Sequence, residues 1–136
     1  PYFEGERTPN RPDATATFFG MTLASTTREN VARAAIEGML CALTDGLDAV
    51  TRLGVSAERI LLIGGAAQNP AVQQIAARVF QVPIDGPEPG EYVAAGAARQ
   101  AGWALTGELP AWSTPVQTHF ESDFDAEVIA HYRARG

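Results

Sequence analysis

Residues 59–70 read Arg-Ile-Leu-Leu-Ile-Gly-Gly-Ala-Ala-Gln-Asn-Pro, and this stretch determines the topology. The apolar run before the glycines predicts a short strand that is covered on both faces. Gly64 and Gly65 have no Cβ, so they tolerate positive φ and leave room for a ligand. Asn69 is a good N-cap, and Pro70 suits the first position of a helix. The stretch predicts a strand, a turn and a helix, which is either a tight connection without a ligand or a binding turn at a strand end.

On either side of this stretch, the hydrophobic pattern predicts an α/β arrangement of helices and short strands. The expected elements are a short strand near 17–20, a long helix over 27–53, a strand over 60–63, a helix over 70–80, a strand over 82–84, a helix over 91–105 and a short helix over 125–133. Helices between short strands indicate a parallel sheet. Two parallel strands are too few for a stable sheet, so we expect the sheet to be incomplete in this chain.

The long helix is expected to begin with a capping box at Thr26-Thr27-Arg28-Glu29 and to end at Gly54. Gly38 and Gly46 interrupt it, and we expect another backbone to approach closely at each. Apolar residues at steps of three or four predict its core face, which comprises Val31, Ala35, Met39, Leu43, Leu47, Val50 and Leu53.

Composition excludes several classes of protein. The chain has 136 residues, of which 46% are hydrophobic, and a net charge of -6, so we expect a globular protein that does not bind nucleic acid. The single cysteine, Cys41, excludes an internal disulfide and indicates a reducing, cytoplasmic location. We expect it to be a small buried apolar residue. No apolar run approaches the roughly 18 residues of a membrane span.

Three motifs follow one another along the chain. Residues 1–9 read Pro-Tyr-Phe-Glu-Gly-Glu-Arg-Thr-Pro. Residues 16–21 read Ala-Thr-Phe-Phe-Gly-Met, and Asn-Val-Ala-Arg-Ala-Ala-Ile-Glu follows at 30–37. The glycine turn at 64–69 precedes Glu-Tyr-Val-Ala-Ala-Gly-Ala-Ala at 91–98. In this order they resemble the C-terminal domain of the FGGY carbohydrate kinases, and most closely the xylulokinase branch of that family.

This resemblance implies part of a ribonuclease-H-like domain in the actin/Hsp70/sugar-kinase ATPase fold. Residues 1–136 are expected to form the C-terminal part of the nucleotide-side domain, and the N-terminal sugar-binding domain is expected to lie outside this chain. Members transfer the γ-phosphate of ATP, with Mg²⁺, to a sugar hydroxyl, here D-xylulose to give D-xylulose 5-phosphate. The general-base aspartate is also expected outside the chain, so no residue here is predicted to be catalytic or to bind metal, and the chain alone is predicted to be inactive.

The resemblance also implies which residues face the nucleotide. Gly65 and Asn69 are expected to contact it and Gly64 to shape the turn, although helix capping alone also explains Asn69. Glu6 and Arg7 are expected either to line the cleft between domains or to pair with each other on a loop. The family often has Ala-Arg-Gly where this chain has Ala-Thr-Ala at 14–16, which puts the behaviour of that loop in doubt.

Several alternatives remain open from the sequence. The sugar is D-xylulose or, in another member of the family, ribulose, fuculose, gluconate or glycerol. A different class is a non-catalytic module that completes its sheet by self-association, as a homodimer for example.

Other polar residues receive simpler interpretations. We expect Glu37 to bond to the loop at 5–7, and Asp45 and Asp48 to lie on a solvated helix face. His119 and His131 are not expected to bind metal, because no other ligand-type residues cluster near them in the sequence.

Overall fold

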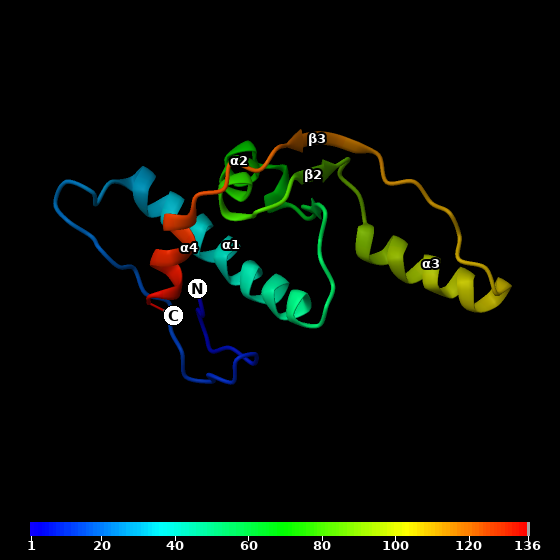
Figure 1. Ribbon diagram of the computed structural model, residues 1–136, viewed down its shortest axis with the longest axis horizontal. Helices are drawn as coiled ribbons and strands as arrows, with labels where there is room; N and C mark the ends of the chain where they lie inside the picture. The colour runs from blue at the N-terminus through cyan, green and yellow to red at the C-terminus, as the bar shows by residue number, and fades with distance from the viewer. Residues whose placement is uncertain (136) are drawn as a thin grey trace. The chain divides into compact units, whose positions relative to one another are not determined.

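A computed structural model of the chain describes residues 1–135, which form two compact units (Figure 1). The first unit combines residues 1–56 with 124–135, and the second contains residues 57–123. The first unit holds helices α1 (Arg28–Arg52) and α4 (Ala126–Arg133). The elements of the second unit are β1 (Ile60–Leu61), the 3₁₀ turn η1 (Ala66–Gln68), α2 (Pro70–Val79), β2 (Ile84–Pro87), α3 (Tyr92–Thr106) and β3 (Val116–Phe120).

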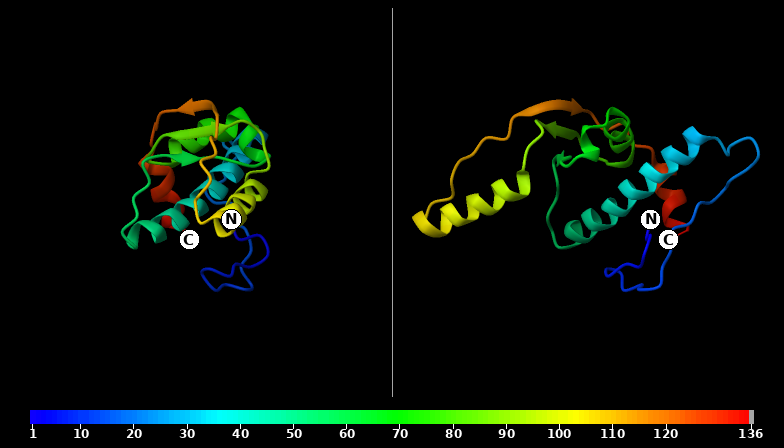
Figure 2. Two further views of the ribbon diagram at one scale, coloured as in Figure 1. Left: turned by 90° about the vertical axis from the view of Figure 1, so that its right-hand side faces the viewer. Right: turned by 180° about the vertical axis from the view of Figure 1, so that it is seen from behind.

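The second unit is built on a three-stranded sheet in the order β1-β2-β3. β1 and β2 are parallel, with Ile60 opposite Ile84, whereas β2 and β3 are antiparallel, with Asp85 opposite His119. Helix α2 packs against β2 and β3, and the further views in Figure 2 show it beside the strands. Its buried face and the adjoining strand form the core of this unit, which includes Val72, Ala76, Val79, Phe80 and Ile84.

The sheet departs from the expected one in its third strand. The parallel pair and the crossover helix are present, but β1 is shorter than the predicted strand, β2 begins two residues later, and Leu61 and Ile63 are exposed, so the expected cover on both faces is wrong. The sequence does not predict β3, because Val-Gln-Thr-His-Phe is short and follows a proline-rich segment. β3 joins the sheet at its β2 edge in the antiparallel sense, so the sheet is mixed. Its pairing is irregular between Gly86 and Pro87, because proline has no amide to donate to the ladder.

Helix α1 begins one residue later than the capping-box prediction. Thr27 is the N-cap and accepts a hydrogen bond from the Asn30 amide at 3.2 Å, so Glu29 does not occupy the position that would close the box. The end of the helix is confirmed: Gly54 follows it with φ of 88°, in the left-handed region that glycine adopts without strain. The strand expected near 17–20 is wrong, since these residues are in no strand.

The predicted core face of α1 is also wrong. The side chains of Met39, Leu43 and Val50 on that face are 41–54% exposed. The buried residues of the helix are Leu40, Cys41 and Thr44, on an adjacent stripe. Apolar periodicity identifies a face suited to burial, but the contacts that the described chain provides decide which face is covered.

Helix α4 is the element that packs on α1 within the first unit. Asp45 accepts a hydrogen bond from the Tyr132 hydroxyl at 2.7 Å, and Asp48 pairs with Arg133. Cys41 lies one turn before Asp45 on the same stripe and is 1% exposed. Both aspartates lie on a solvent-accessible face of the helix, as predicted, and each also bonds to a residue of α4. The prediction that Cys41 is buried is confirmed.

The glycines inside the helices do not serve close packing among the described residues. A Cβ built at Gly38, Gly46 or Gly96 meets no described atom within 4 Å. The expected close approach of another backbone at Gly38 and Gly46 is therefore wrong for residues 1–135. Helix α3, which carries Gly96, has no buried residue in the described chain.

Candidate functional site

The glycine turn after β1 has the strand–turn–helix geometry that its sequence predicts. Gly64 has φ of 102°, which a side chain would oppose, so glycine is required there. The chain then makes one 3₁₀ turn, in which the amides of Ala67, Gln68 and Asn69 donate to the carbonyls three residues earlier at 3.1–3.3 Å. Helix α2 follows directly, so the turn is held at both ends.

Gly65 differs from Gly64 because nothing in the described chain requires a glycine at position 65. Its backbone is right-handed helical, with φ of -61° and ψ of -43°, which any residue adopts. A Cβ at this position meets no described atom within 4 Å. Among the described residues, the Gly65 amide also makes no hydrogen bond to protein. The position is open, polar and without a side chain.

Asn69 caps helix α2 with the oxygen of its side chain and leaves its side-chain nitrogen unused by the cap. Its Oδ1 accepts a hydrogen bond from the Ala71 amide at 2.9 Å, and Pro70 follows at the first helical position, which confirms the capping prediction. Within the described part of the chain, its Nδ2 donates to no partner. Asn69 is exposed, so capping and a contact with a ligand are compatible.

Gln73, a buried residue of α2, holds the turn through a side-chain hydrogen bond. Gln73 is 9% exposed, and its Nε2 donates to the Ala67 carbonyl at 2.8 Å. The bond ties α2 to the 3₁₀ turn and fixes the turn's shape. A glutamine four residues after the N-cap is common on solvated helices, so its role is not visible in the sequence.

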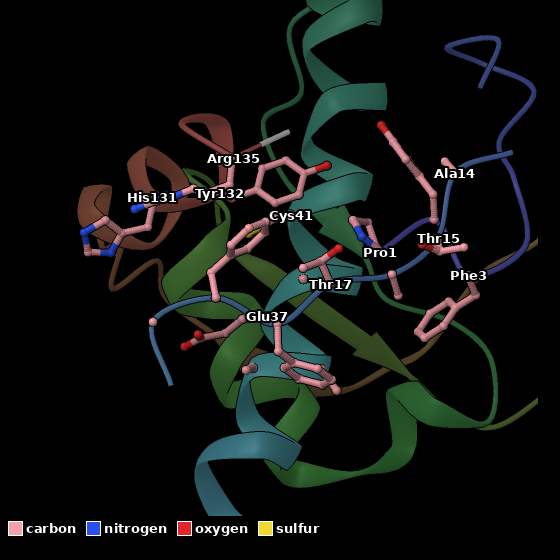
Figure 3. Close-up of a pocket in the computed structure, with 18 of the residues that line it drawn as sticks. Pro1, Phe3, Ala14, Thr15, Thr17, Glu37, Cys41, His131, Tyr132 and Arg135 are labelled. Carbon is pink, nitrogen blue, oxygen red and sulfur yellow. The ribbon is translucent and has the colours of Figure 1, made fainter. Parts of the chain in front are cut away.

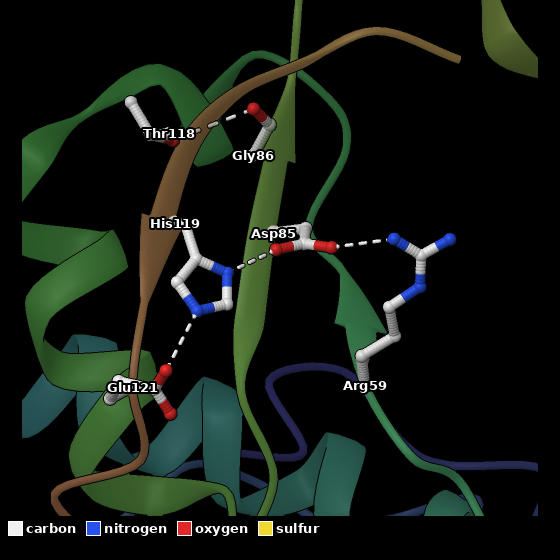
Figure 4. Close-up of polar contacts among 6 residues, drawn as sticks. All are labelled: Arg59, Asp85, Gly86, Thr118, His119 and Glu121. Atoms are coloured by element: carbon white, nitrogen blue, oxygen red, sulfur yellow. Dashed lines mark hydrogen bonds and ion pairs between the residues drawn. The ribbon is translucent and has the colours of Figure 1, made fainter. Parts of the chain in front are cut away.

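A charged cluster connects Arg59, which directly precedes β1, with Asp85 on β2 and His119 on β3 (Figure 4). Asp85 on β2 is 4% exposed, and its two carboxylate oxygens bond to Arg59 at 2.8 Å and to His119 at 2.6 Å. The Asp85 carbonyl also accepts the Leu62 amide at 2.9 Å, two residues before Gly64. The cluster thus anchors the strand that precedes the turn. It cannot be recognised in the sequence, because its members are 26 and 34 residues apart.

The loop predicted to line a cleft lies in the first unit. Gly5 has φ of 78°, and a Cβ there would meet the Pro12 carbonyl oxygen at 2.4 Å, so the loop closes only with glycine. The Glu6 carboxylate accepts the amides of Arg7 and Thr8 at 2.8 and 3.2 Å. Glu6 therefore stabilises its own turn. The cleft role of Glu6 and Arg7 stays a prediction.

The first unit contains a cavity of about 630 Å³, bounded by the N-terminal segment, α1 and α4 (Figure 3). Glu37 lines it and pairs with Arg33 at 2.7 Å, so the expected bond from Glu37 to the loop at 5–7 is replaced by a bond within the helix. Cys41 also lines the cavity. Burial, together with the carboxylates of Glu37 and Asp45, raises the pKa of the Cys41 thiol to about 11. The thiol stays protonated at neutral pH and is a poor nucleophile.

The described residues contain neither a group of three or more His, Cys, Asp or Glu side chains suited to a metal ion nor a helix long and apolar enough to cross a membrane. Gly64, Gly65 and Asn69 lie together in one turn of the second unit, whereas Glu6 and Arg7 lie in the first unit.

Comparison with known proteins identifies the family. Residues 1–105 match the C-terminal domain of the FGGY family of carbohydrate kinases. A xylulose kinase of Streptomyces coelicolor is 38% identical over 132 residues, which cover 90% of this chain and 27% of that protein. A glycerol kinase of Rhodopirellula baltica is 35% identical over 117 residues, which cover 81% of this chain and 21% of that protein.

Among solved structures, xylulose kinase from Bifidobacterium adolescentis has a TM-score of 0.81 and 51% identity, covering 100% of this chain and 28% of that one. The chain thus spans little more than a quarter of the length of these xylulose kinases. Its mixed α/β fold with a small sheet is that of part of a sugar kinase, as the motifs predicted. The chain belongs to the FGGY family of carbohydrate kinases, and its residues 1–105 match the C-terminal domain of that family.

Proposed function

We propose that this chain is the nucleotide-side C-terminal part of an ATP-dependent sugar kinase, which transfers the γ-phosphate of ATP to D-xylulose. The substrate is the one in the names of several relatives, including the kinases of Streptomyces coelicolor and Escherichia coli. In this proposal residues 1–136 belong to one domain, and the sugar-binding domain and the general-base aspartate are supplied by another part of the protein. The buried, protonated thiol of Cys41 suits the reducing cytoplasm, where ATP is abundant.

The observation that carries the proposal is the open position at Gly65. Neither backbone conformation nor packing accounts for a glycine there. A ligand that presses against the backbone does account for it, because a side chain would occupy the ligand's place. The turn lies at the carboxyl end of a parallel strand, where ligands bind in open α/β sheets. The unbonded Gly65 amide adds a donor of the kind that ribose, adenine or phosphate oxygens accept.

Asn69 supplies the second contact in this proposal. Its Oδ1 is held by the helix it caps, so the side chain has a fixed direction, and its Nδ2 remains as a donor toward the nucleotide. The fixed direction lowers the entropy cost of binding. Gly65 and Asn69 thus hold the adenosine end, while Gly64 and Gln73 keep the turn in shape.

The residues of this chain position the nucleotide and do not perform the transfer. When bound, ATP would supply the phosphoryl group that is transferred, and Mg²⁺ would supply the positive charge that neutralises the phosphate oxygens. Phosphoryl transfer depends mainly on positioning and electrostatic stabilisation, so a misplaced adenosine lowers the rate even though its contacts lie away from the reacting atoms.

A panel of sugars tests the activity and the substrate together. ADP release by the intact kinase with ATP and Mg²⁺ is measured with D-xylulose, D-ribulose, L-fuculose, gluconate and glycerol. Selective turnover of D-xylulose supports the proposal. Preference for another sugar keeps the kinase and rejects the substrate, and glycerol is the next candidate because a glycerol kinase also matches this chain. No turnover of any sugar by folded protein contradicts the proposed activity.

A matched pair of glycine variants tests the nucleotide contact. Gly65→Val places a branched side chain in the proposed adenosine position, so we expect the KM for ATP to rise about tenfold or more with the KM for sugar unchanged. Gly46→Val is the control, because Gly46 also has open space around its Cβ position but lies on α1. An equal effect of both variants, or no effect of Gly65→Val, contradicts the assignment.

A further inference from the structure

His119 on β3 lies between two carboxylates, one on the neighbouring strand and one just beyond its own (Figure 4). Its Nδ1 is 2.6 Å from Oδ1 of Asp85, and its Nε2 is 3.1 Å from Oε1 of Glu121. Asp85 is almost fully buried, whereas the side chains of His119 and Glu121 are 51% and 83% exposed. The ring therefore connects a buried anion on β2 to an exposed anion at the end of β3.

This geometry requires a particular protonation state of the ring. An ionised carboxylate only accepts hydrogen bonds, so a ring nitrogen facing it must carry a proton. A neutral imidazole has a single N–H and can serve one of the two carboxylates, leaving a lone pair against the other. Only the imidazolium donates to both at once, so the arrangement of the two carboxylates favours a positively charged His119.

The charges around His119 favour the same state. The other oxygen of Asp85 bonds to Arg59, which keeps Asp85 ionised. On the packed elements, Asp85 is the only charged residue of β2, and Arg78 is the only one of α2. The hydrogen bonds to Asp85 and then to Glu121 raise the pKa of His119 above its usual range. The hydrogen bond from His119 likewise lowers the pKa of Asp85.

We propose that His119 is a pH-dependent clasp that holds β3 on β2 when protonated and loosens this edge of the sheet when it loses its proton. Asp85 and His119 are directly opposite each other in the register, so their bond lies in the middle of the β2–β3 pairing. Deprotonation removes the donor that faces Glu121 and the positive charge of the ring, so the remaining hydrogen bond to the ionised Asp85 loses the attraction between two opposite charges.

The other bonds around β3 indicate which residues would separate from β2 when His119 loses its proton. The Thr118 hydroxyl reaches the Gly86 carbonyl at 3.5 Å, which is a long contact. Beyond the strand, the Ser122 hydroxyl donates to the Phe80 carbonyl at 2.7 Å and the Asp123 amide to the Ala77 carbonyl at 2.9 Å. These bonds keep the segment after β3 attached to α2, so the effect is confined to residues 116–120.

The direction of the pH dependence follows from the raised pKa of His119. A group whose pKa is raised by folding stabilises the folded state below its ordinary value, about 6.5 for histidine, and this stabilisation is lost as the pH rises through the folded value. The clasp is therefore closed below the ordinary histidine pKa and opens as the pH rises through the raised pKa of His119. We expect the ratio of closed to open forms to fall progressively over that interval.

Hydrogen exchange of the intact protein tests both parts of the proposal. Exchange of the His119 ring C–H, followed by mass spectrometry over about pH 5–9, gives the titration midpoint, which we expect above about 6.5. Amide exchange in a peptide covering β3, corrected for the intrinsic rate at each pH, should accelerate as the pH passes that midpoint. A peptide covering α4 serves as the internal reference. A midpoint at or below about 6.5, or β3 protection independent of pH, overturns the proposal.

Three variants separate the clasp from general stability. Glu121→Gln removes one anion from an exposed side chain and should lower the His119 midpoint, whereas the control Glu108→Gln, also exposed, should not. His119→Arg keeps a cation at all these pH values, so β3 should stay protected above neutrality. Loss of protection in His119→Arg equal to that in wild type at high pH, with the protein folded, contradicts the role of charge. Equal midpoints in wild type and Glu121→Gln contradict it as well.

Discussion

Gly65, in the turn that follows β1, and Gly86, within the neighbouring parallel strand β2, are glycines for different reasons. A Cβ at Gly86 would lie 2.3 Å from Oγ1 of Thr118 and 3.1 Å from Nε2 of Gln73, so packing excludes a side chain. A Cβ at Gly65 would meet no described atom within 4 Å. Packing therefore enforces glycine at Gly86 and does not enforce it at Gly65, where the proposed ligand would.

The largest loss of stability is expected when a side chain is placed at Gly86. Gly86→Val must displace Thr118 or Gln73, so we expect the free energy of unfolding to fall by about 1–3 kcal/mol. Gly65→Val should change it by less than about 0.5 kcal/mol, because the site is open. Urea denaturation of the two variants makes the measurement. Adding Thr118→Ala should restore part of the stability of Gly86→Val, and equal losses from both glycine variants would show that the two positions do not differ in this way.

Asp85, the residue before Gly86, makes the stability of this part of the sheet depend on pH. Since the hydrogen bond from His119 and that from Arg59 lower the pKa of Asp85, its ionised form stabilises the fold above the ordinary carboxylate value and this stabilisation is lost in acid. Asp85→Asn should therefore lose most stability at mildly acidic pH, where His119 is also charged. The difference from wild type should shrink below about pH 4, as Asp85 itself becomes protonated. A difference that stays constant from about pH 3 to 8 in thermal denaturation would contradict this role.

Substitutions of Asn69 test whether this residue stabilises the fold by capping α2, apart from any contact with a ligand. Asn69→Ala removes the cap of α2 and should cost about 1 kcal/mol in the free energy of unfolding. Asn69→Ser keeps a capping oxygen and should cost only a few tenths. Chemical denaturation compares them, and an equal loss in both variants would show that capping is not what stabilises this turn.

The smallest effect is expected in the first unit, on the bonds between α1 and α4. Asp48 and Arg133 are both about half exposed, so Asp48→Asn should lower the free energy of unfolding by at most about 1 kcal/mol. The loss should shrink in high salt, because screening weakens exposed ion pairs. A loss as large as that of Gly86→Val would mean that exposed pairs, and not buried packing, dominate the stability of this chain.

The sequence predicted the elements whose signals are local. Helix α2 lies at the predicted residues because Asn69 and Pro70 fix its start, and the end of α1 follows from Gly54. The family was also predictable, because its motifs are runs of adjacent residues. The turn at 64–69 was predicted for the same reason.

The strand near 17–20 and the capping box at 26–29 are wrong although their signals are local, but the other wrong predictions concern contacts between distant residues. The face of α1 that is buried depends on α4, whose bonding residues follow their partners on α1 by 85 and 87 positions, and β3 depends on pairing with β2. The cluster of Arg59, Asp85 and His119 comes together only when these strands pair. Propensity and periodicity carry no information on such pairings, so the support of the candidate site was not predictable.

The most direct test of the nucleotide assignment is calorimetric titration of ADP into the intact kinase and its Asn69→Ser variant. Serine keeps the helix cap but lacks the Nδ2 donor, so stability and binding are separated. We predict a nearly unchanged unfolding transition and a dissociation constant for ADP that rises about tenfold, the equivalent of one lost hydrogen bond of roughly 1.4 kcal/mol. An unchanged dissociation constant in the folded variant would contradict the assignment of this turn to the nucleotide.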